Sequence, residues 1–171
     1  MSQLAFLLDQ RYCVGCQSCQ TACQVKNTSP VGISLRQAIS SEAVAKGPYI
    51  SLSCNHCEMP NCFASCPLNA ISKDPETGIV IIDQELCDGC GDCITACPYS
   101  IPIINPETNK ANKCDFCKEL IDEGELPECV RACPVKVLIF GDLDEFDRIG
   151  EKEAVGFTYE ETKPAVRFIV S

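Results

Sequence analysis

Sixteen cysteines among 171 residues are the side chains of this sequence with the clearest chemistry. They form four groups of four, with none left over: Cys13, Cys16, Cys19 and Cys23; Cys54, Cys57, Cys62 and Cys66; Cys87, Cys90, Cys93 and Cys97; and Cys114, Cys117, Cys129 and Cys133. Multiples of four suit tetrahedral zinc sites or four-iron cubane clusters. The opening MSQLAFLLDQ has no basic residue before its apolar run. We therefore expect no export signal, and a reducing compartment in which eight disulfides are disfavoured.

The spacing of the cysteines favours iron and sulfur over zinc. The third group reads CDGCGDCITACP, and CVGCQSCQTAC in the first group repeats most of it. In this bacterial ferredoxin pattern three close thiolates bind one cubane and the fourth binds another cluster. Four-thiolate zinc sites usually present two CxxC knuckles with a long spacer, which only the fourth group faintly resembles. The spacing predicts four 4Fe-4S clusters, with a zinc-stabilised interaction scaffold as the remote alternative.

The crossed-ligand rule gives a definite map of the four clusters. Cysteines four positions apart lie on one face of a helical turn, so that one turn can bridge two clusters. The predicted ligand sets are Cys13, Cys16, Cys19 and Cys133 for cluster 1; Cys114, Cys117, Cys129 and Cys23 for cluster 2; Cys54, Cys57, Cys62 and Cys97 for cluster 3; and Cys87, Cys90, Cys93 and Cys66 for cluster 4. These sixteen thiolates are the predicted metal ligands.

The segments between the cysteines predict short strands and turns. Residues 70–83 and 101–113 each place a Pro-Glu-Thr turn between short runs, which is typical of a small hairpin. We expect a strand over Ile33–Ile39, although ISLRQAISSEAVAKG also fits an amphipathic helix. VKVLIFGDLDEF predicts a strand closed by Gly141 and an acidic turn, and AVRFIVS predicts an edge strand. The expected fold class is α+β: two pseudo-symmetric bacterial-type two-cluster ferredoxin modules with short strands, hairpins and helical turns.

The two expected modules share the chain unequally. Residues 54–97 have the size and layout of a complete inner two-cluster module, and residues 1–53 with 98–171 would form an outer module from both ends. The chain has no Trp and only seven Phe, so its apolar core must be thin. We expect metal ligation to supply much of the folding energy.

Several other side chains near the cysteines are candidates for supporting roles. Arg11, Arg131, Lys113 and Lys118 lie close in sequence to ligands; most are expected to be solvated, and Lys113 is the best candidate for raising a cluster's potential. His56, the single histidine, cannot make the two-histidine Rieske site. We expect it at the surface or behind the ligands. The small Gly89 and Gly91 should permit close approach of backbone to cluster.

The remaining composition excludes several classes of function. Asp and Glu number 24 against 14 Lys and Arg, a formal charge of −10, which disfavours nucleic acid and anionic lipid. No segment approaches 18 uninterrupted apolar residues, so we expect no membrane span. Neither a phosphate-binding glycine loop nor a nucleophile–base pair stands out, and we expect no catalytic residues.

With these groups in hand, the sequence resembles the four-cluster iron-sulfur electron-transfer subunit, or beta subunit, of the dimethyl sulfoxide reductase family of molybdenum and tungsten oxidoreductases. CVGCQSCQTAC, SLSCNHCEMPNCFASCPLNAI, CDGCGDCITACPYSIP, KCDFC with PECVRACP, and FGDLDEF carry the resemblance, and DEFDRIGE departs from the usual Asp-Pro-x-Ser continuation. The resemblance implies the same cysteine map.

The resemblance also implies partners and a role in anaerobic respiration. The partner would be a large catalytic subunit holding a bis-pterin Mo or W cofactor. Electrons would pass to or from a membrane anchor, a cytochrome or a soluble donor. A polyferredoxin subunit of a hydrogenase or formate-hydrogen lyase complex is the alternative. The location would be cytoplasmic, or exported in folded form with a partner that bears a twin-arginine signal.

Overall fold

A computed structural model describes residues 3–40 and 48–170 as a small α+β fold of short elements, which confirms the expected class. The strands are β1 (Leu4–Asp9), β2 (Gln37–Ser40), β3 (Tyr49–Leu52), β4 (Ile71–Lys73), β5 (Val80–Ile82), β6 (Ile103–Asn105), β7 (Lys110–Asn112), β8 (Leu138–Asp142) and β9 (Val166–Ile169). The helices are α1 (Ser18–Lys26), α2 (Asn61–Ala64), α3 (Asp92–Ala96), α4 (Lys118–Asp122), α5 (Glu128–Arg131) and α6 (Leu143–Phe146). Within the described ranges, no helix is long and apolar enough to cross a membrane.

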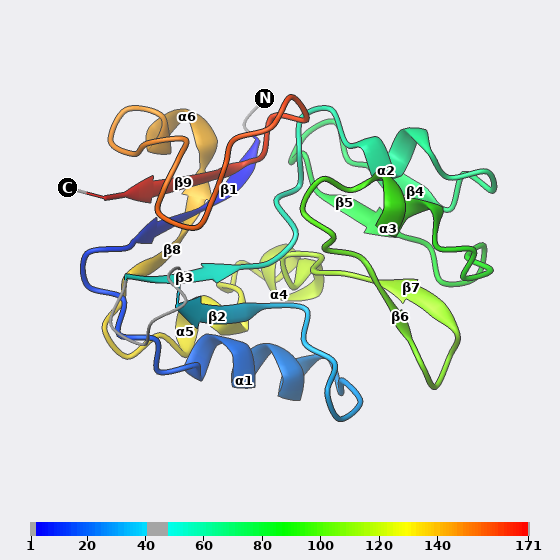
Figure 1. The fold of residues 1–171 in the computed structure, drawn as a ribbon, viewed down its shortest axis with the longest axis horizontal. Helices are drawn as coiled ribbons and strands as arrows, with labels where there is room; N and C mark the ends of the chain where they lie inside the picture. The colour runs from blue at the N-terminus through cyan, green and yellow to red at the C-terminus, as the bar shows by residue number, and fades with distance from the viewer. Residues whose placement is uncertain (1–2, 41–47, 171) are drawn as a thin grey trace.

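A three-stranded sheet ties the two ends of the chain together. Its strand order is β8-β1-β9, with β1 antiparallel to β8 and parallel to β9. Figure 1 shows the blue β1 strand between the yellow-brown β8 and the red β9. Ala5 to Leu8 are all buried, as a central strand covered on both faces requires. The apolar run at the start of the sequence is therefore the middle of this sheet.

The C-terminal predictions hold in part. The edge strand in AVRFIVS is confirmed as β9. The strand before the acidic segment is also present, but Gly141 lies inside β8 and does not close it. The predicted acidic turn is the short helix α6, because the Asp142 carboxylate accepts a hydrogen bond of 2.7 Å from the Asp144 amide and caps its first turn.

Both predicted hairpins are confirmed. β4 pairs with β5 and β6 with β7, each antiparallel. A side chain that precedes each Pro-Glu-Thr turn fixes it, because Asp74 accepts from the Glu76 amide at 2.8 Å and Asn105 accepts from the Glu107 amide at 2.9 Å. The strand expected over Ile33–Ile39 begins only at Gln37. The alternative helix extends into residues 41–47, which lie outside the described residues.

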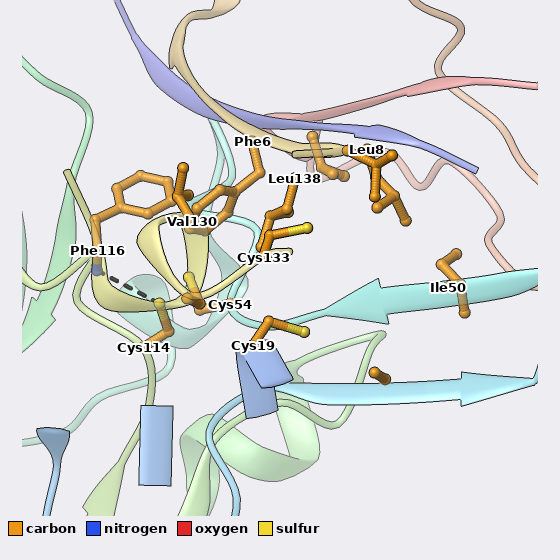
Figure 2. Packing of buried hydrophobic residues seen from close by; sticks show 14 of the residues in the cluster. Phe6, Leu8, Cys19, Ile50, Cys54, Cys114, Phe116, Val130, Cys133 and Leu138 are labelled. Atoms are coloured by element: carbon orange, nitrogen blue, oxygen red, sulfur yellow. Dashed lines mark hydrogen bonds between the residues drawn. The ribbon is translucent and has the colours of Figure 1, made fainter. Parts of the chain in front are cut away.

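Cysteine sulfurs occupy much of the interior. The main core packs Phe6, Leu8, Phe116 and Leu138 around a set of buried cysteines: Cys19, Cys54, Cys114, Cys129 and Cys133. Figure 2 shows Cys19, Cys54, Cys114 and Cys133 among the apolar side chains of this core. A smaller core joins Cys62 and Cys93 to Ile71, Val80 and Ala111. The core is thus built around positions where thiols, not large apolar side chains, converge.

Candidate iron-sulfur sites

Helix α1 and the turn after α5 gather the first predicted ligand set. Cys13, Cys16, Cys19 and Cys133 line one cavity of about 340 Å³. Its CVGC loop turns at Gly15, whose φ is +65° and where a Cβ would lie 2.3 Å from the Tyr49 ring. Glycine is required there both for the left-handed backbone and for the closeness of β3.

The same two helices also contribute to the second ligand set, together with the residues before α4. Cys23, Cys114, Cys117 and Cys129 line a separate cavity of about 280 Å³. α1 packs against α5, and each contributes to both cavities: Cys19 and Cys23 come from α1, and Cys129 and Cys133 from α5 and the residues after it. The four-residue spacing on each helix separates the two sulfurs by about 6 Å along its axis.

The inner cysteines form a third cavity of about 340 Å³, lined by Cys66, Cys87, Cys90 and Cys93. Backbone amides point at two of its sulfurs: Ala70 N lies 3.3 Å from Cys66 Sγ, and Ala111 N lies 3.4 Å from Cys87 Sγ. Amides directed at sulfur are the second set of contacts that an iron-sulfur cluster uses. Figure 1 places this cavity's elements, α3, β4 and β5, away from α1 and α5.

Mutual charge effects indicate that the fourth set is also close together. The pKa of Cys57 is raised to about 11, mainly by burial, and the charges of Cys54 and Cys97 act in the same direction. Burial likewise raises the pKa of Cys62 to about 12, with Cys54, Cys97 and Cys57 acting in the same direction. The structure therefore brings together all four predicted sets; that these sulfurs bind clusters stays a prediction.

The thiols need a positive charge to ionise. Desolvation by burial is the main cause that raises the pKa of Cys13, Cys23, Cys93, Cys114, Cys117 and Cys129. Cys16, which is exposed, differs from these six, because its hydrogen bonds with Ser18 lower its pKa. Iron bound at these positions would supply the missing positive charge, since a coordinated thiol is deprotonated.

The arrangement of donors fits a cluster better than a zinc ion. All sixteen cysteines are free of disulfide bonds. Within residues 3–40 and 48–170, no three His, Cys, Asp or Glu side chains converge on the position of a single metal ion. A tetrahedral zinc site with Zn–S bonds of about 2.3 Å needs its sulfurs within roughly 4 Å of one another. Thiolates spread around a cavity match a larger inorganic core.

Of the four candidate basic residues, only Lys113 is buried. Arg11 pairs with Asp9 at 2.8 Å, Lys118 with Asp122 at 2.7 Å, and Arg131 with Glu128 at 3.3 Å, all near the surface. Lys113 is 4% exposed, and its ammonium donates to the carbonyls of Val80 and Cys114. A desolvated cation beside a ligand is what the prediction for Lys113 requires.

His56 is fully buried, which rules out the surface position and leaves the other predicted position, behind the ligands. Its ring stacks on Phe116 with centroids 3.7 Å apart, and its Nδ1 accepts a 2.9 Å hydrogen bond from the Val80 amide. Desolvation lowers its pKa well below the usual value. The backbone at His56 is left-handed, with φ 42°.

Sequence reasoning missed Arg36. Its side chain is 1% exposed and lines the cavity of Cys23, Cys114, Cys117 and Cys129. The available signal was one basic residue within the otherwise uncharged run ISLRQAIS.

Comparison with known proteins agrees with this chemistry. The 4Fe-4S dicluster domain family matches residues 45–143, and a 4Fe-4S binding domain matches residues 12–26. The chain is 39% identical to the thiosulfate reductase electron transfer subunit PhsB of Salmonella typhi, over 89% of this chain and 84% of that protein. It is 36% identical to the B subunit of anaerobic dimethyl sulfoxide reductase of Escherichia coli K12, over 84% and 76% respectively. It is 42% identical to protein NrfC of the same organism. The aligned residues make up 80% of this chain and 64% of NrfC.

These matches, together with the cysteine-lined cavities, define a 4Fe-4S protein. This protein belongs to the iron-sulfur beta-subunit family of dimethyl sulfoxide reductase-type molybdenum and tungsten oxidoreductases.

Proposed function

We propose that this chain is a non-catalytic electron relay that carries four 4Fe-4S clusters for a molybdopterin catalytic subunit. The observation that carries the proposal is the gathering of sixteen cysteines into four sets, three of which line separate cavities. A bound cluster supplies one-electron redox chemistry. The residues of this chain bind the clusters, direct amides at their sulfurs and exclude water from them.

The proximity of neighbouring cysteine sets supports one continuous path for electrons. Cys93 of the cluster 4 set and Cys62 of the cluster 3 set lie in one small core. The charge of Cys54, from the cluster 3 set, acts on Cys114 of the cluster 2 set. Cys129 of the cluster 2 set is similarly affected by Cys19 of the cluster 1 set. The inferred order is therefore 4, 3, 2, 1, with steps on the order of 10 Å where one helical turn separates ligands.

The ends of this path are the places where electrons can be exchanged. Cys16 in the cluster 1 set and Cys90 in the cluster 4 set are the two exposed cysteines, and the sets between them are more buried. Relay through two exposed ends suits an intermediary between two redox partners.

The two-module arrangement is part of the proposal. Residues 54–97 would form the inner module, and residues 1–53 with 98–171 the outer one. The β8-β1-β9 sheet and the α1–α5 packing support an outer module built from both ends. The last segment also crosses to the inner residues, since Glu58 N donates to Lys163 O at 2.9 Å and Ala165 N donates to Asn55 O at 2.8 Å.

The partners follow from the relatives. One relative is named an electron transfer subunit of thiosulfate reductase and another a B subunit of dimethyl sulfoxide reductase. By analogy, a large subunit with a bis-pterin Mo or W cofactor is the proposed catalytic partner. A membrane anchor, a cytochrome or a soluble donor would complete the circuit. The complex would act in the cytoplasm, or outside it after export in folded form with a twin-arginine-bearing partner.

Anaerobic copurification tests the proposal. The tagged protein should be brown, lose visible absorbance on reduction, and bring down a large protein containing Mo or W and pterin. A Cys90→Ser variant serves as control, because it should alter one cluster's signal and retain the partner. If a hydrogenase is recovered in place of a pterin protein, the chain would instead be an electron-transfer subunit of a hydrogenase complex. A colourless protein containing zinc would contradict the proposal altogether.

A further inference from the structure

Arg36 is a buried cation that forms no ion pair with a carboxylate of the described residues. One guanidinium nitrogen donates to the Ser51 carbonyl and hydroxyl at 3.2 and 3.0 Å, and another donates to the Ser53 hydroxyl at 2.8 Å. The guanidinium carbon lies 4.2 Å from the centre of the Phe6 ring. A buried charge without an ion pair is strongly destabilising unless another charge compensates it.

The cavity is where that compensation would come from. Arg36 lines the space enclosed by Cys23, Cys114, Cys117 and Cys129. Its Nε is buried and has no hydrogen-bond partner in the part of the chain that the structure describes. The positive charge of Arg36 opposes the effect of burial at Cys23, Cys114 and Cys129. The side chain therefore presents an unused donor and a full positive charge to one thiol set.

Lys113, the other buried cation near these ligands, is placed differently. Its ammonium is directed at the carbonyls of Val80 and Cys114, and it is absent from the lining of this cavity. Arg36 is the cation among the residues that line this cavity, so its effect should be largest on the cluster held there.

Building on the proposed function, we propose that Arg36 is the internal counter-charge of the cluster held by Cys23, Cys114, Cys117 and Cys129, and raises the reduction potential of that cluster above the value it would have without the cation. Adding an electron makes a cluster more negative, and a desolvated cation at close range stabilises the reduced form more than the oxidised form. Arg36 is thus a positioning and tuning residue that controls where an electron rests along the relay.

Redox titration of the anaerobically purified protein, followed by electron paramagnetic resonance, tests this role. Arg36→Gln removes the charge and retains a hydrogen-bond donor, whereas Arg36→Lys keeps the charge and loses the planar fork. Arg131→Gln is the matched control, since it removes the same charge two residues from Cys129, but at a surface position already paired with Glu128.

Arg36→Gln should lower the potential of one cluster, decreasing its reduced-to-oxidised ratio at fixed potential at least tenfold, which is about 59 mV for one electron. Arg36→Lys should retain most of the wild-type potential, and Arg131→Gln should leave all potentials unchanged. Unchanged potentials in a fully assembled Arg36→Gln protein would overturn the inference. If Arg36→Gln does not assemble clusters but Arg36→Lys does, the positive charge is what the cluster requires, which supports the proposal. If neither variant assembles clusters, Arg36 has a structural role and the proposal is overturned. Absence of sulfide from the wild-type protein would instead refute the proposed function itself.

Discussion

Alanine substitutions at the two glycines of the CDGCGDC loop would distinguish the cost of backbone strain from the cost of a steric clash with a neighbouring segment. Gly89 and Gly91 have φ values of +80° and +85°, so alanine should cost about 1–2 kcal/mol at either position through left-handed strain alone. At Gly89, however, a Cβ would lie 2.0 Å from the Asn109 carbonyl oxygen, a backbone atom. At Gly91 nothing lies within 4 Å. The difference between two otherwise similar substitutions is therefore one steric contact.

That contact should matter for the cluster as well as for stability. Relieving it requires the β6–β7 turn to move by about 1 Å or more, and overpacking of this kind typically costs a further 1–3 kcal/mol. The total for Gly89→Ala is then about 2–5 kcal/mol, against about 1–2 kcal/mol for Gly91→Ala. The displaced hairpin also carries Ala111, whose amide lies 3.4 Å from Cys87 Sγ. Gly89→Ala should thus impair the cluster predicted at Cys66, Cys87, Cys90 and Cys93.

Iron and sulfide content, together with the temperature of anaerobic unfolding, measure both effects. We expect Gly91→Ala to retain a full complement of iron with a modest loss of stability. Gly89→Ala should unfold at a clearly lower temperature and lose about a quarter of its iron, since one of the four proposed clusters is affected. Equal behaviour of the two variants would refute the steric argument.

Three further predictions concern the core and the ligands. Phe116→Ala should destabilise the folded protein by about 3–5 kcal/mol, because a fully buried ring that contacts Phe6, His56 and Phe140 is lost. Phe63→Ala, which removes a half-exposed ring, should cost far less. Similar unfolding temperatures of the two variants would contradict this prediction. Cys133→Ala should remove the signal of the cluster at Cys13, Cys16 and Cys19 and spare the one at Cys114, as resolved by paramagnetic resonance; the opposite loss would overturn the crossed map. Chelation of iron under reducing conditions should leave a largely unfolded chain, because ligation provides stability that the thin core lacks; a cooperatively folded cluster-free form by circular dichroism would argue against it.

Local spacing allowed much of the site to be predicted from the sequence. A CxxCxxC loop forms within a few residues, so its first three thiols are close whatever the rest of the chain does. The four-residue step from Cys19 to Cys23, or from Cys129 to Cys133, places sulfurs on one helical face. The hairpins at Asp74 and Asn105 are equally local, since each depends on a side chain that binds a backbone amide two residues ahead.

The features that sequence reasoning missed depend on contacts between distant segments. β1 is a central strand because β8 and β9, more than 120 residues later, pair with both its edges. The sequence left His56 either at the surface or behind the ligands, because its burial depends on stacking with Phe116 from a distant segment. Arg36 is buried for the same reason, since Phe6 from β1, Ser51 from β3 and Ser53 just after β3 enclose it.

Iron and acid-labile sulfide analysis of the anaerobically purified protein tests the central claim most directly. Four cubanes in sixteen cysteines predict about 16 iron atoms and about 16 sulfides per polypeptide, with zinc near zero. A protein that contains about four zinc atoms and no sulfide would contradict the account.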